Sequence, residues 1–70
     1  MEKNIAKLLM DSLLVLDEPL NRATELTDQI NDEEERKRFR KGIGEIGGRV
    51  YTDLMVPIIR QYPDLDPEKN

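Results

Sequence analysis

The chain has 70 residues, of which 37% are charged, and its 11 basic and 15 acidic side chains give a formal net charge of −4. A chain this short has room for one small domain and buries only about 60% of its unfolded surface, so a fold standing alone is marginally stable. Cysteine and histidine are both absent, which excludes disulfides and a structural zinc site as supports and leaves oligomerisation or close helix packing.

The first predicted element is a helical arm between Ile5 and Ile30, where apolar residues recur at spacings of three and four. Pro19 interrupts this arm, because proline lacks an amide hydrogen and clashes with the preceding turn. The arm is therefore either kinked at Pro19 or broken there into two helices, with Asp17 capping the second. The sequence leaves both alternatives open.

A turn at Asn31-Asp32 separates the first arm from a second one. Asp32 is followed three positions later by Glu35, the spacing of a capping box at a helix start. The second arm should run from about residue 33 to about residue 61, with a kink at Pro57 and an end at Pro63. Its predicted apolar stripe consists of Phe39, Ile43, Ile46, Val50, Leu54 and Ile58.

The two arms have similar lengths, so the fold class predicted is all-α, a helical hairpin with antiparallel arms. Residues 1–62 should form a single helical domain, and residues 63–70 a short extended tail with Tyr62 and Leu65 folding back on the helices. We expect two such hairpins to dimerise into a four-helix bundle. If Pro19 breaks the first arm, the alternative is a three-helix monomer in which two short helices line up along a long one.

Gly42, Gly44 and Gly47 spell the G-x-G-x-x-G pattern of dinucleotide-binding loops. That pattern requires a preceding strand, and none is predicted here, whereas the helical stripe continues in phase through the glycines. We therefore expect a helix whose Gly44, Gly47 and Gly48 form a packing seam against residues 16–20. A helix break at residues 42–44 and a phosphate site remain as weaker alternatives.

The basic segment Arg36–Lys41 is a candidate for nucleic-acid contact, with Phe39 as a stacking ring. Its residues also form acid-before-base pairs at i,i+4 with residues 32–34, which is typical of a stable helix start. Side chains suited to catalysis are few, since the chain has a single serine, Ser12, and no histidine or cysteine. We expect no enzyme, no catalytic residue, no cofactor and no metal site.

Apolar residues are more numerous near the termini than one hairpin needs, since they cover most of the circumference of both arms there. We expect the surplus to form a dimer interface made of Met10, Leu14, Val15, Met55 and Ile59. Arg49, Tyr51, Tyr62 and Leu65 would then be a possible surface for a further, unidentified protein partner. The apolar runs are too short to span a membrane, and the chain opens on an amphipathic pattern rather than a signal peptide.

The sequence thus predicts a small acidic, cytoplasmic protein without membrane contact, an interaction or regulatory protein that works through protein–protein contacts as a homodimer. The alternative is a nucleic-acid-associated accessory factor that uses the basic segment Arg36–Lys41, although the net negative charge makes nucleic-acid binding unlikely.

Overall fold

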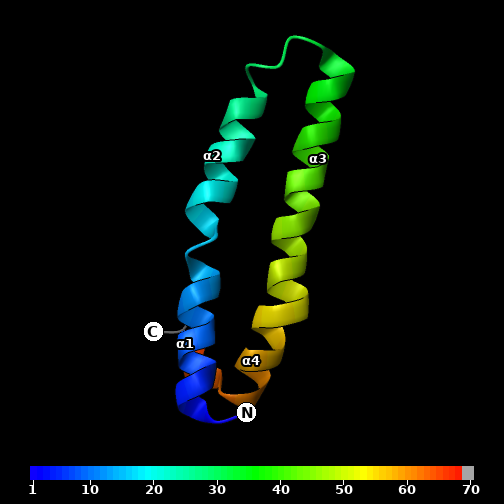
Figure 1. Cartoon of the computed structure of the whole chain (residues 1–70). Helices are drawn as coiled ribbons and strands as arrows, with labels where there is room; N and C mark the ends of the chain where they lie inside the picture. The colour runs from blue at the N-terminus through cyan, green and yellow to red at the C-terminus, as the bar shows by residue number, and fades with distance from the viewer. Residues whose placement is uncertain (69–70) are drawn as a thin grey trace.

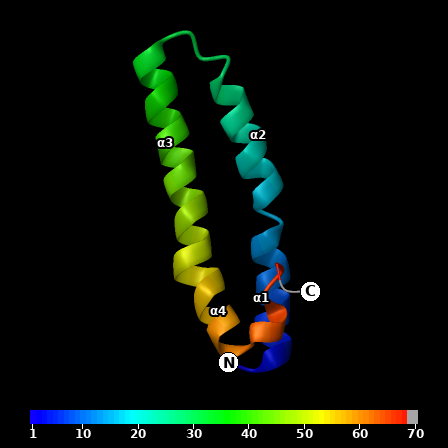
Figure 2. The same cartoon turned by 180° about the vertical axis from the view of Figure 1, so that it is seen from behind.

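Two helical arms lie side by side and antiparallel in the computed structural model, which describes residues 1–68 (Figure 1). The first arm consists of α1 (Lys3–Leu14) and α2 (Asp17–Thr27). The second arm consists of α3 (Glu33–Arg49), the π-helix η1 (Val50–Met55) and α4 (Val56–Gln61), and a 3-10 turn η2 (Pro63–Leu65) follows it. The view from behind shows the same two-arm arrangement (Figure 2), so the predicted all-α helical hairpin is confirmed.

The first arm is broken rather than kinked. Pro19 cannot donate an amide hydrogen to the carbonyl four residues back, which belongs to Val15, and α1 ends one residue before Val15. The second helix begins with Leu16 as its N-cap and no side-chain cap bond, so the cap predicted at Asp17 is wrong and Asp17 is the first helical residue. The two helices nevertheless stay roughly in line along the second arm (Figure 1).

The turn between the arms has the predicted cap. Asp32 has an extended backbone, with φ −73° and ψ 123°, and its carboxylate accepts a hydrogen bond from the Glu35 backbone N–H at 3.3 Å. Three glutamates occupy the first turn of α3, where negative charge is favoured by the helix dipole. The start of the second arm therefore follows directly from its local sequence.

A π-helical insertion in the second arm shifts which apolar residue faces the first arm. Along the second arm, the residues that face the first arm recur every three or four positions as far as Val50. The next residue that faces the first arm is Met55, five positions after Val50. The Val56 N–H bonds to the Tyr51 carbonyl, an i to i−5 bond that accommodates one extra residue. Met55 is 5% exposed whereas Leu54 is 48% exposed, so the predicted place of Leu54 in the inner stripe is wrong.

The buried core occupies only the half of the hairpin that carries the termini. Its members are Ala6, Met10, Leu13, Met55 and Ile58. Within the described chain, α3 contributes no buried residue and α2 contributes only Thr27. The half near the turn is therefore held by the contact between α2 and α3, without a buried apolar core.

The chain end folds back onto the start of the first arm. The Tyr62 hydroxyl donates to the Met1 carbonyl at 2.7 Å, and Lys3 forms an ion pair with Asp64. Tyr62 and Leu65 are partly buried against the core. The segment predicted to be extended from residue 63 thus begins with the 3-10 turn, while its last two residues lie outside the described chain.

Candidate interaction surface

The residues predicted for the dimer interface do not form one exposed surface. Met10 and Met55 are 2% and 5% exposed because they form the core of the hairpin itself, so they have almost no surface left for a second chain. Leu14 and Ile59 are partly buried against that core, whereas Val15 is 69% exposed beside the break in the first arm. Folding of the single chain therefore buries part of the apolar surplus at the terminal end, while Leu8 and Leu16 stay 62% and 40% exposed.

The predicted glycine seam is limited to one position. A Cβ on Gly47 would lie 3.9 Å from Leu20 Cδ1, whereas a Cβ on Gly44 or Gly48 would meet no atom within 4 Å. The packing expected at Gly44 and Gly48 is thus not found within the chain. The helix α3 passes through these positions without interruption, so the alternative of a break at residues 42–44 is also wrong.

The basic segment pairs mostly with acidic groups of its own chain. The ion pairs are Lys37 with Glu33 at 3.1 Å, Arg40 with Asp28 at 3.4 Å and Lys41 with Glu45 at 4.0 Å. Arg36 donates to the Ile30 carbonyl at 3.1 Å, and Arg38 lies 5.7 Å from the centre of the Phe39 ring. The contacts of Arg36 with Ile30 and of Arg40 with Asp28 join the start of α3 to the end of the first arm and the turn.

One broad face of the hairpin is apolar along both arms. In a helix the residue before an inward-facing one is rotated by about 100°, and in two antiparallel helices this rotation leads to the same face of the pair. Exposed or partly exposed apolar side chains occupy this position repeatedly. We call the set the apolar face: Leu9, Pro19, Leu26, Phe39, Ile46 and Leu54, which precede Met10, Leu20, Thr27, Arg40, Gly47 and Met55.

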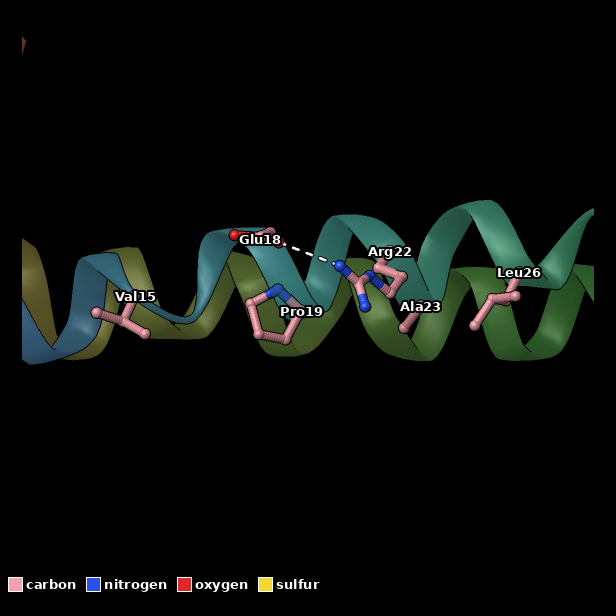
Figure 3. A pocket seen from close by; sticks show the side chains of 6 residues that line it. All are labelled: Val15, Glu18, Pro19, Arg22, Ala23 and Leu26. Atoms are coloured by element: carbon pink, nitrogen blue, oxygen red, sulfur yellow. Dashed lines mark hydrogen bonds and ion pairs between the residues drawn. The ribbon is translucent and has the colours of Figure 1, made fainter.

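Shallow hollows follow the apolar face on both arms. On the second arm one hollow lies around Phe39 and the next around Leu54, and the two hollows adjoin at Ile46, which lines both. On the first arm a hollow is lined by Val15, Glu18, Pro19, Arg22, Ala23 and Leu26 (Figure 3). Its four apolar side chains lie along one side of the arm, and Arg22 lies 3.2 Å from the Glu18 carboxylate.

Much of the opposite face is polar or lacks side chains, although Leu14, Tyr51, Val56 and Ile59 also follow inward-facing residues in the terminal half. Its positions follow the inward-facing residues and include Asp11, Asn21, Asp28, Lys41, Gly44 and Gly48. Tyr51 lies on this side and is 53% exposed. Arg49 lies instead at the edge of the apolar face and forms an ion pair with Asp53 at 3.1 Å. Of the predicted partner surface, Arg49 is thus separated from Tyr51, while Tyr62 and Leu65 lie together against the core.

Groups for chemistry do not gather at any of these places. Within residues 1–68 no three acidic side chains are arranged to hold a metal ion. Across the same residues, every helix is too short or too polar to cross a membrane. Comparisons of the chain with protein-family models, curated proteins and solved structures found no match.

Proposed function

We propose that this is a small non-enzymatic interaction or regulatory protein that works through protein–protein contacts as a homodimer. Its helices carry an exposed apolar face instead of a cleft with convergent polar groups. Surfaces of this kind are used for association between proteins.

The observation that carries the proposal is the area left exposed by the single chain. Its accessible surface is 5581 Å². A globular monomer of 8.2 kDa should expose about 4,500 Å², so the hairpin exposes about 1,000 Å² more than its mass predicts. The surface excess is comparable with the ~800 Å² that each partner buries in a standard interface.

The shape of the chain supports the same proposal. The Cα radius of gyration is 14.9 Å, against about 11 Å for a compact domain of 70 residues. The molecule measures 46 × 20 × 17 Å, so it is more than twice as long as it is wide. Stable domains normally bury their helices between at least two layers, and association supplies the missing layer.

The test is the mass of the protein in solution, measured by light scattering over a wide range of concentrations. We expect twice the chain mass of 8.2 kDa at micromolar concentration and above, with dissociation on dilution. A mass of one chain throughout this range would overturn the homodimer. Small-angle scattering on the same samples gives an independent readout, because two stacked hairpins are thicker than a single free hairpin.

A further inference from the structure

We infer that a second copy of this chain covers the apolar face, with the two hairpins parallel and their turns at the same end. This inference rests on the proposed homodimer and names the surface and the arrangement that form it. It replaces the terminal-end residues predicted from the sequence with a face that extends along most of both arms.

The place where the apolar face is most exposed is also where the hairpin lacks a core. Leu26, Phe39 and Ile46 are 54%, 52% and 58% exposed, and all three lie in the half near the turn. The buried core residues belong to the other half. A layer placed on the apolar face would supply the burial that α2 and α3 do not obtain from each other.

The side of the molecule that carries the apolar face has room for a stable dimer interface. This side measures about 46 by 20 Å, and a standard interface buries about 800 Å² on each partner. This is also close to the excess surface of the single chain. A second hairpin of the same dimensions covers the whole face, and the opposite face, with its aspartates, lysine and glycines, then remains in solvent.

Charges at the edge of the face favour a second copy over an acidic or basic partner. The hollow of the first arm is lined by Glu18 and Arg22, and the hollows of the second arm are lined by Arg38, Arg49 and Asp53, with Glu45 next to Ile46 in the sequence. Each arm therefore presents charges of both signs at its edge. An edge that carries both positive and negative charges does not favour a strongly acidic or a strongly basic partner. In a dimer, however, the acidic groups of one copy can pair with the basic groups of the other.

The register of the two arms determines which of these charged residues lie at the same level along the hairpin. Leu20 lies level with Gly47, and Asp28 pairs with Arg40 at 3.4 Å. Counting from these pairs, Glu18 lies about level with Arg49 and Arg22 about level with Glu45 on the other arm of the same chain.

A twofold axis parallel to the arms brings these charges together between copies. Such an axis places the first arm of one copy over the second arm of the other, at the same level. Glu18 then faces Arg49 of the second copy, and Arg22 faces Glu45 of the second copy. Within one chain Glu18 pairs with Arg22 and Arg49 pairs with Asp53, with side chains 53% to 81% exposed, so these weak pairs exchange partners easily.

The first experiment measures the dimer dissociation constant of the variant Ile46→Glu and of the control Tyr51→Glu. Both residues are more than half exposed in the single chain, so circular dichroism should show an intact hairpin in each case. Ile46 lies on the apolar face and Tyr51 on the opposite one. We expect the dissociation constant to rise at least about 100-fold for Ile46→Glu, because a charge would be buried without a partner, and to change less than about threefold for Tyr51→Glu.

The outcomes separate this inference from the proposed function. A wild-type protein that is monomeric overturns both. A wild-type dimer that Ile46→Glu leaves intact overturns the apolar face as the interface, while the homodimer stands. Loss of the dimer in Tyr51→Glu with Ile46→Glu unaffected would place the interface on the opposite face.

The parallel arrangement of the two hairpins can be tested separately by spin labelling. Because the chain has no cysteine of its own, a single introduced cysteine takes the label. A nitroxide label on the variant Asn31→Cys marks the turn of each hairpin. Parallel hairpins place the two labels within about one molecular width, 20 Å, whereas antiparallel hairpins separate them by nearly the molecular length of 46 Å. A long distance in an intact dimer overturns the parallel arrangement. Charge reversal checks the same point: Glu18→Arg and Arg49→Glu should each weaken the dimer, and the double variant should recover it.

Discussion

Leu20 Cδ1 lies 3.9 Å from the position that a Cβ on Gly47 would occupy, a distance of ordinary van der Waals contact. Of the four glycines in the described chain, Gly47 is the one with such a neighbour. The hairpin therefore does not need glycine at these positions to bring its arms together. Each glycine still costs the helix about 1 kcal/mol relative to alanine.

The variants Gly44→Ala and Gly48→Ala should each raise the free energy of unfolding by about 0.5 to 1 kcal/mol, because alanine improves helix propensity and meets no neighbour. Urea unfolding followed by circular dichroism measures the change. Gly47→Ala is the matched comparison, since its new methyl group would contact Leu20. A loss of stability in Gly44→Ala would contradict the prediction and indicate that another chain packs on the glycine side.

The adjacent residues Leu54 and Met55 should respond very differently to truncation. Met55→Ala removes a side chain that is 5% exposed and should lower the free energy of unfolding by about 2 to 5 kcal/mol. Leu54→Ala changes a side chain that is 48% exposed, so in the dissociated chain it should cost less than about 1 kcal/mol. Unfolding curves at concentrations below dimer dissociation measure both. Equal losses would mean that the π-helical insertion does not form in solution.

The sequence predicts the parts of this fold that depend on neighbouring residues. The spacing of apolar residues predicts two arms, and Asp32 with Glu35 predicts where the second begins. The π-helix could not be predicted in this way, because Leu54, Met55 and Val56 are consecutive apolar residues and fit the inner side of the arm in more than one phase. The choice of Met55 depends on how η1 packs against α1, which is a tertiary effect.

The burial of two predicted interface residues within the chain has the same origin. Met10 and Met55 are apolar, and their sequence positions do not distinguish burial within the chain from burial between chains. The helical spacing of Phe39 and Ile46 also predicts them for the inner stripe. Only the position of the other arm places Ile43 and Gly47 inside and leaves Phe39 and Ile46 exposed.

The cap at the turn gives a prediction about local stability. Asp32→Ala removes the acceptor of the Glu35 N–H bond at 3.3 Å and should lower the free energy of unfolding by about 1 kcal/mol. Asp32→Ser should recover most of this loss, because serine is also a good N-cap. Asn31→Ala is the control, since Asn31 precedes the cap. The measurement is urea unfolding, and a cap that contributes nothing would make all three variants equal to the wild type.

Pro19 should cost the protein little, although it stands in the middle of the first arm. It is the third residue of α2, and the amide groups in the first turn of a helix have no partner within that helix, so the missing N–H of Pro19 matters little. We therefore expect Pro19→Ala to change the free energy of unfolding by less than about 1 kcal/mol in the dissociated chain. Ala23→Pro places proline inside the same helix and should cost about 3 kcal/mol or more. Urea unfolding compares the two, and a gain near 3 kcal/mol for Pro19→Ala would mean that the break at Val15 and Leu16 is a strained kink that alanine relieves.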